Sequence, residues 1–225
     1  MLAEAIPHTQ TSAPRFYSTD APEFSLRIAA EGSWEYLHLA TYIMNVYRLK
    51  YQADIRVAYP LLLGISNEGE DLPFAALGIR KAIRPLFLER YLDLPVEKAI
   101  EEKTGIVVQR SAIAEVGNLA SYTTTGVLKL LHCLAVYLDQ TGYDHLVFTG
   151  TSSLLKPVFR KLGSACHVLA DAKPERLGEE QKSWGSYYST SPKVVVARVP
   201  AFRSVITDIM HQGLAGQFLG GAIVQ

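Results

Sequence analysis

A carboxylate, a glycine and an amide side chain fall within four residues of the segment EVGNLAS, residues 115–121. The surrounding residues are apolar and β-branched, so the segment is typical of a buried strand. A carboxylate in such a place is unfavourable unless a cation pairs with it or its pKa rises, and a carboxylate of raised pKa can take a proton from an amine. We therefore identify Glu115 as a candidate catalytic base. A structural ion pair with Arg80 or Arg110 is the alternative role.

Gly117 interrupts this strand where its polar residues occur. In a regular strand, Glu115 shares one face with Leu119, and Asn118 shares the other face with Ala120. A glycine here indicates a bulge or the close approach of another part of the chain, and a bulge leaves backbone N–H groups available to a ligand. We expect a thioester at this open ladder, where an N–H group can hold the developing oxyanion. The residues expected to contact the acyl donor are Val116, Gly117, Asn118 and Leu119.

The next residues, SYTTTG, join the strand to a helix that is apolar on almost every side. A helix N-terminus presents free N–H groups and a positive partial charge, so it can bind a carrier phosphate with help from hydroxyl groups. Threonines before a helix also serve as simple caps, which is the alternative. The residues expected to meet phosphate are Thr123, Thr124, Thr125 and Gly126. Carboxylate, open ladder and phosphate-binding helix together predict acyl transfer to an amine.

The composition argues against several functional classes. Lys and Arg number 22 and Asp and Glu number 22, so we expect no nucleic-acid partner. Cys133 and Cys166 lie far apart with no ligand at zinc spacing, which predicts buried thiols and no metal. The first residues lack a secretory pattern, and the longest apolar run falls short of the roughly 20 residues of a spanning helix. We expect a cytoplasmic protein that is not integral to a membrane.

Strand and helix patterns alternate along the chain and predict an α/β fold of the layered α+β kind around one sheet. Helices are predicted over 33–55, 94–105, 123–143 and 152–163. Strands are predicted over 57–66 and 72–80, as a hairpin, and over 106–121, 145–151, 165–171 and 193–200. We expect a disordered tail over 1–22, one domain over 23–200, and a C-terminal helix with a flexible Gly-rich arm over 201–225.

Four stretches together resemble the thermostable haemolysin family of bacterial proteins, namely EVGNLAS, VFTGTSSLLKPVFRKLG, LADAKPERL and WGSYYSTSPKVVVARV. The resemblance covers about residues 24–200, and WGSYY with the following SP and strand is its most specific part. That family looks like a distant branch of the GNAT-like acyltransferases and is similar in layout to acyl-homoserine-lactone synthases. The resemblance implies a GNAT-like mixed central sheet flanked by helices. It also implies an acyl-phosphopantetheine thioester as co-substrate and no tightly bound cofactor.

The resemblance implies roles for single residues as well. Glu115 matches the strand carboxylate that is the proposed base of the synthases, and Arg80 matches a strand arginine in the first half of their site. Arg48 lies in NVYRLKYQADI, which is similar to the aromatic and arginine pattern of their N-terminal helix. We expect both arginines to anchor an acidic or polar part of the acceptor. The aromatic residues expected in the substrate pocket, with core packing as the alternative, are Trp184, Tyr187 and Tyr188.

Two positions depart from the GNAT pattern. YTTTGVL keeps only Gly126 of the usual pyrophosphate loop, and Phe159 stands where many of these enzymes have a tyrosine that protonates the thiolate. Such a loop is more compatible with the single phosphate of an acyl carrier protein than with coenzyme A. The prediction is an N-acyltransferase that moves a fatty acyl group from a thioester carrier, either acyl carrier protein or coenzyme A, to a small amine. The alternatives are a membrane-active haemolysin and a non-catalytic acyl-carrier binding module.

Overall fold

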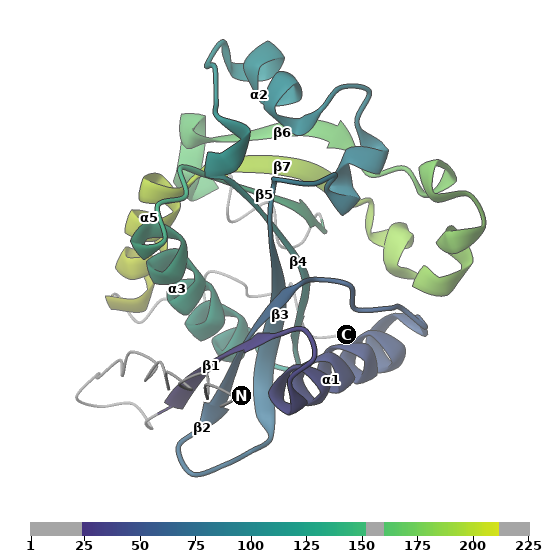
Figure 1. Ribbon diagram of the computed structural model, residues 1–225, viewed down its shortest axis with the longest axis vertical. Helices are drawn as coiled ribbons and strands as arrows, with labels where there is room; N and C mark the ends of the chain where they lie inside the picture. The colour runs from purple at the N-terminus through teal and green to yellow at the C-terminus, as the bar shows by residue number, and fades with distance from the viewer. Residues whose placement is uncertain (1–23, 152–159, 212–225) are drawn as a thin grey trace, which may run out of the picture.

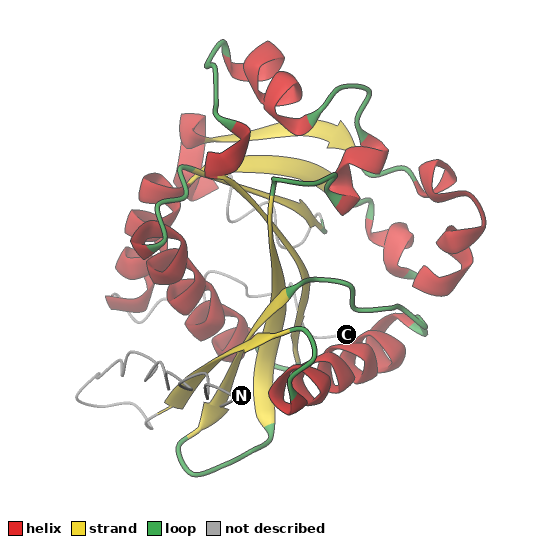
Figure 2. Ribbon diagram, viewed as in Figure 1, coloured by secondary structure: helices red, strands yellow, loops and turns green. Residues whose placement is uncertain are grey.

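The structure is a computed structural model that describes residues 24–151 and 160–211. These residues form a mixed seven-stranded sheet in the order β1-β2-β3-β4-β5-β7-β6, with helices on both faces (Figure 1, Figure 2). Neighbouring strands are antiparallel except β4 and β5, which are parallel. The predicted mixed central sheet flanked by helices is therefore confirmed.

The elements have the following bounds. The strands are β1 (Phe24–Ala30), β2 (Leu61–Asn67), β3 (Pro73–Lys81), β4 (Ile113–Ser121), β5 (His145–Gly150), β6 (Cys166–Asp171) and β7 (Lys193–Arg198). The α-helices are α1 (Trp34–Tyr51), α2 (Val96–Thr104), α3 (Thr124–Gln140) and α5 (Val199–His211). The 3₁₀ helices are η1 (Phe87–Tyr91), η2 (Arg110–Ala112), η3 (Gly163–Ala165), η4 (Pro174–Trp184) and η5 (Tyr187–Thr190).

The helix ends follow from local chemistry. The Ser33 hydroxyl accepts a hydrogen bond from the Tyr36 N–H at 3.1 Å and so caps α1, and Thr123 caps α3 in the same way. Gly105 ends α2 in the left-handed conformation, with φ of 72°. The sequence signals for these three helices were therefore correct, although α1 ends earlier than expected because Gln52 takes a left-handed conformation.

The core is divided between the two faces of the sheet. Helices α3 and α5 pack side by side on one face, and α1 and α2 lie on the other (Figure 1). Because successive residues of a strand point to opposite faces, Ala114 and Leu146 pack under α3, whereas Ile113 and Val147 pack with α2. The centre of the sheet, β4 and β5, is thus covered on both sides.

Several predicted bounds were wrong. The strand expected over 106–121 begins only at Ile113, because β3 ends at Lys81, which pairs with Ala114. Strand β1 was not predicted, and η4 and η5 occupy the stretch expected to be a loop and a turn. The C-terminal helix begins at Val199, and its Phe202 packs in the core under α3. The predicted tail, the Gly-rich arm and residues 152–159 of the predicted 152–163 helix lie outside the described residues. Residues 160–163 of that helix are described, and 160–162 are helical.

Candidate active site

The sheet opens between β4 and β5. The two strands pair only over their first halves, where residues 113–116 lie opposite residues 145–148. Beyond this point β5 continues against β7 alone, and β4 continues against β3 alone. Among the residues that the structure describes, the second half of β4, from Gly117 to Ser121, therefore has no pairing partner on its β5 side. The open ladder expected at this segment is confirmed.

A bulge in β4 coincides with this opening. Strand β3 pairs Gly78 with Gly117 but Ala76 with Ala120, so β4 has one residue more than β3 between these pairs. The extra residue is accommodated by Asn118, whose φ is 51°, in the left-handed region. The bulge predicted from Gly117 is present, but Asn118 and not the glycine takes the unusual conformation.

The bulge changes which side chains share a face. Val116 and Leu119 both contribute to the cluster under α3, and Ala120 belongs to the cluster under α1. The expectation that Glu115 and Leu119 share a face, with Asn118 and Ala120 on the other, is therefore wrong: Leu119 lies opposite Glu115, and Asn118, beside Tyr47, lies with Ala120 on the side of α1. The physical reason is the added residue, since one extra position reverses the alternation beyond it.

A cavity of about 230 Å³ passes through the opening. On the side of α1 it is lined by aromatic residues, namely Tyr47, Tyr51, Tyr59, Phe87, Tyr91, Trp184 and Tyr187. On the side of α3 and α5 it is lined by apolar residues, namely Val127, Leu131, Leu134, Leu146 and Phe202. Backbone and side chains of residues 115–119 lie between the two groups. The cavity thus joins an aromatic, polar end to an apolar end across the sheet.

Glu115 is buried in the wall of this cavity, with 1% of its surface exposed. Its carboxylate oxygens accept hydrogen bonds from the Leu88 N–H at 2.8 Å and the Phe87 N–H at 3.1 Å, both at the start of η1. A guanidinium nitrogen of Arg80 lies 3.8 Å from Oε2. Burial raises the pKa of Glu115 above its ordinary value, although the two N–H groups and Arg80 act in the opposite direction. The geometry combines a raised pKa with firm positioning by two backbone donors.

Tyr59 is a site residue that the sequence did not reveal. Its ring lies across the glycine pair of β3 and β4, since a Cβ added at Gly78 would lie 2.3 Å from its Cγ and one at Gly117 would lie 2.0 Å from its hydroxyl. Burial raises the pKa of Tyr59, and the charge of Glu115 adds to this effect. The signal was present as two glycines facing each other on adjacent strands, but it requires the register of the sheet.

Arg80 connects several parts of the site. Its guanidinium donates a hydrogen bond to the Ala58 carbonyl at 2.6 Å and lies 5.1 Å from the centre of the Tyr59 ring. Together with its approach to Glu115, these contacts fix the arginine in the cavity wall. The alternative partner considered for Glu115, Arg110, instead pairs with Glu89 and Glu97 away from this cavity.

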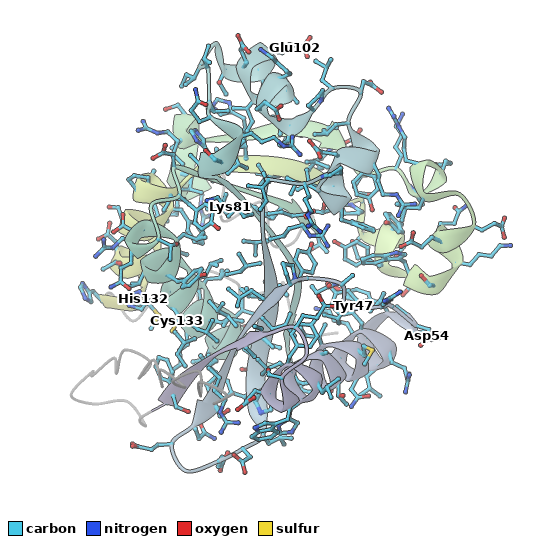
Figure 3. The ribbon with its side chains drawn as sticks, in the orientation of Figure 1. Tyr47, Asp54, Lys81, Glu102, His132 and Cys133 are labelled. Atoms are coloured by element: carbon cyan, nitrogen blue, oxygen red, sulfur yellow. The ribbon has the colours of Figure 1, made fainter. Side chains whose placement is uncertain are left out.

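The aromatic segment WGSYY is held against the end of α1. Gly185 has a φ of 50°, and a Cβ there would lie 2.1 Å from the Tyr51 carbonyl oxygen. This close approach places Trp184 and Tyr187 in the cavity wall, where both rings contact Tyr47. Figure 3 shows Tyr47 on the side of α1 that faces the sheet.

Tyr188 does not line the cavity. Its hydroxyl is hydrogen-bonded to that of Tyr91, which does line it, so Tyr188 lies one layer behind the wall. The structure therefore brings two of the three predicted aromatic residues to the cavity directly.

The predicted phosphate-binding residues lie at the margin of the cavity. Ser121 and Val127, which flank them, line it, whereas the four residues of 123–126 do not. The Thr123 hydroxyl accepts a hydrogen bond from the Gly126 N–H at 3.0 Å. A Cβ on Gly126 would lie 2.5 Å from the Ser121 hydroxyl oxygen, so the tight start of α3 requires this glycine. Capping by Thr123 is observed, and a phosphate role remains a proposal.

Arg48 is not brought to the cavity. It lies on the exposed side of α1, 3.5 Å from Asp54, which Figure 3 shows beyond the end of the helix. The cations that line the cavity beside Arg80 are Lys50 and Arg56. The sequence pattern placed Arg48 on the correct helix, but the face depends on the 100° step between helix residues and on the exact packing of Tyr47.

Two further observations concern the described residues. They contain no group of three or more His, Cys, Asp or Glu side chains that could hold a metal ion. In the same ranges, 24–151 and 160–211, no helix is both long and apolar enough to cross a membrane. Phe159, at the position of the expected thiolate-protonating tyrosine, lies outside the described residues.

A family model described as thermostable hemolysin matches residues 29–202. The chain belongs to the thermostable haemolysin family. The matched range spans the sheet from the end of β1 to the start of α5, and so includes the opening, the cavity wall and Glu115. A comparison with curated proteins gives no match.

Solved structures similar to this haemolysin-family chain include two kinds of synthase. The acyl-homoserine-lactone synthase LasI has 14% identity and a TM-score of 0.54, with 80% of this chain and 91% of LasI covered. FeeM, an N-acyl amino acid synthase from uncultured soil microbes, has 16% identity and a TM-score of 0.54, with 83% and 96% covered. BjaI, a coenzyme A-dependent acyl-homoserine-lactone synthase with bound SAM and isopentyl-CoA, has 9% identity and a TM-score of 0.54, with 90% and 92% covered. The likeness confirms the predicted layout of the fold.

Proposed function

We propose that the protein is an N-acyltransferase that moves a fatty acyl group from a thioester carrier to a small amine. The observation that carries this proposal is the position of Glu115, a buried carboxylate of raised pKa beside an opening in the sheet that leads to an apolar cavity. The fold it shares with acyl-homoserine-lactone and N-acyl amino acid synthases agrees with an acyl-transfer role.

The acyl donor occupies the opening between β4 and β5. The edge of residues 117–121, which no described strand pairs with on this side, offers backbone groups to the amides of phosphopantetheine and to the thioester oxygen, with Asn118 beside them. The acyl tail extends into the apolar end, which Leu131 and Phe202 bound from α3 and α5. The carrier phosphate meets the start of α3 at residues 123–126. This arrangement separates the apolar tail from the polar head of the donor.

The reaction requires one base and no tightly bound cofactor. A bound ammonium group gives one proton to Glu115, directly or through water, and the free amine attacks the thioester carbonyl carbon. The C–S bond breaks as the amide C–N bond forms, and the second nitrogen proton passes to the leaving thiolate. The departing thiol, with an ordinary pKa of about 8.5, needs little assistance from an acid.

The donor is an acyl carrier protein in preference to coenzyme A. The start of α3 keeps only Gly126 of the usual pyrophosphate loop, and its hydroxyl groups suit one phosphate better than a diphosphate. Both donors are made in the cytoplasm, which is where we place the reaction.

The test measures free thiol released by the pure protein from long-chain acyl carrier protein and acyl-CoA, with and without pooled amines. Mass spectrometry of the same reactions identifies the amide. We expect thiol release that depends on amine and matches the amide formed. Liposome leakage caused by the protein without any thioester, together with no thiol release, would instead establish direct membrane activity. Binding of acyl carrier protein without turnover under any amine would leave only a carrier-binding module.

A further inference from the structure

The aromatic end of the cavity has an excess of positive charge. Its lining includes three cations, Lys50, Arg56 and Arg80, and two carboxylates, Glu115 and Glu180. Glu180 is already paired with Arg90, and Glu115 is held by backbone N–H groups and Arg80. Among the described residues, no acidic side chain forms an ion pair with Lys50 or Arg56. Lys50 and Arg56 thus line the cavity without an ion-pair partner in the part of the chain that the structure describes.

Lys50 is placed where an anion in the cavity would stabilise its ammonium group. Its ammonium group lies 5.3 Å from the centre of the Tyr51 ring, and partial burial lowers the pKa of Lys50. An anionic ligand in the cavity would offset this loss of hydration. Arg56, which also lines the cavity, offers a planar fork that suits a carboxylate.

The donor phosphate is not the anion that these cations serve. The Ser121 hydroxyl, just before α3, and the Tyr42 hydroxyl of α1 both donate hydrogen bonds to the Phe74 carbonyl. The start of α3 therefore lies near Tyr42, whereas Lys50 is eight residues further along α1, or about 12 Å at 1.5 Å per residue. The cations lie instead on the face of the sheet that holds Glu115.

Resting on the proposed function, we infer that the acceptor is an amino acid, an amine with a carboxylate one or two carbons from its nitrogen. Its amino group lies at Glu115, which takes the proton, and its carboxylate lies toward Arg56, Lys50 and the free edge of Arg80. The aromatic rings around them provide an apolar surface for the amino-acid side chain. Charge complementarity at both ends of the acceptor fixes the nitrogen for attack.

The experiment compares pairs of acceptors that differ only in the carboxylate, such as leucine with 3-methylbutylamine and phenylalanine with 2-phenylethylamine. We expect kcat/KM for amine-dependent thiol release to be at least about tenfold higher for the amino acid of each pair. Lys50→Gln and Arg56→Gln should raise KM for the amino acid several-fold and leave KM for the matched amine unchanged. Arg48→Gln is the control, because it removes the same charge from the same helix but outside the cavity.

The outcomes separate this inference from the proposed function. If amines without a carboxylate are acylated as fast as amino acids, the enzyme is an acyltransferase but the inference is wrong. The inference is also wrong if Lys50→Gln and Arg56→Gln raise KM for the acyl donor instead, since the cations would then serve the carrier. If neither amino acids nor amines without a carboxylate stimulate thiol release, the proposed function itself is wrong.

Discussion

Two carboxylates hold the same short helix, η1, in different electrostatic surroundings. Glu89 accepts hydrogen bonds from the N–H groups of Leu86 and Val96, at 2.7 and 2.8 Å. Glu115 accepts them from Phe87 and Leu88, at 3.1 and 2.8 Å. Glu89 therefore fixes the residue before η1 and the first residue of α2, and Glu115 fixes two residues of η1, so each carboxylate holds two backbone donors.

The two carboxylates differ in the arginine beside them and in burial, since Glu115 is 1% exposed and Glu89 is 15% exposed. Arg110 approaches both oxygens of Glu89, at 2.6 and 2.8 Å, whereas Arg80 lies 3.8 Å from Glu115 and bonds Ala58 instead. Burial acts to raise both pKa values, but Arg110 and the Val96 and Leu86 N–H groups together outweigh it and lower the pKa of Glu89, while burial keeps the pKa of Glu115 raised. A tightly paired carboxylate is suited to structure, and a loosely paired one that lines a cavity is suited to accept a proton.

The largest expected effect follows from removing the candidate base. Glu115→Gln keeps the volume of the side chain but removes its ability to take a proton, so kcat/KM for amine-dependent thiol release should fall about a hundredfold. Glu89→Gln, the matched change at the other carboxylate, should leave kcat/KM within about threefold for the folded protein. Equal losses in the two variants, corrected for the folded fraction by circular dichroism, would remove the distinction between the carboxylates.

A smaller effect is expected at the glycine that supports Tyr59. In Gly117→Ala the new Cβ would lie 2.0 Å from the Tyr59 hydroxyl, so the ring must move from its place beside Glu115. We expect kcat/KM to fall about tenfold and the free energy of unfolding to fall by about 1–3 kcal/mol, as for other overpacked sites. Steady-state kinetics and urea unfolding measure the two effects. Wild-type activity in this variant would show that Tyr59 has no role in shaping the site.

The smallest effect on activity, and a clear effect on stability, is expected at Glu89. Its carboxylate is 15% exposed and paired with Arg110, so Glu89→Gln breaks a largely buried ion pair and should destabilise the fold by about 2 kcal/mol. For a chain of this size that corresponds to a melting temperature lower by about 4–8 °C. Thermal unfolding followed by circular dichroism measures it. An unchanged melting temperature together with lost activity would reverse the roles assigned to the two carboxylates.

The parts of the fold that could be predicted from the sequence depend on local signals. Ser33, Thr123 and Gly105 mark helix ends by chemistry that acts within one turn, and all three were identified correctly. The carboxylate and Gly117 in one strand were enough to indicate an open ladder, because both are unfavourable in a regular buried strand.

The parts that could not be predicted depend on register and on packing between distant segments. Tyr59 gains its place only because Gly78 and Gly117 pair across two strands, a contact that no local pattern encodes. Lys50 lines the cavity and Arg48 does not, because the side of α1 that faces the cavity is set by the burial of the Tyr47 ring. The single residue added at Asn118 then reverses the alternation that the strand pattern had implied.

The most direct test of the central claim, that Glu115 is the base, is the pH dependence of kcat/KM in wild type and in Glu115→Gln. The titration of the amine is common to both proteins, so the ratio of wild-type kcat/KM to Glu115→Gln kcat/KM at each pH isolates the titration of the carboxylate. A base acts only when deprotonated, and burial raises the pKa of Glu115 above the ordinary value of 4.5. We therefore predict a ratio that is level at high pH and falls, as pH decreases, through a midpoint above 4.5. A ratio that does not change with pH would contradict the account.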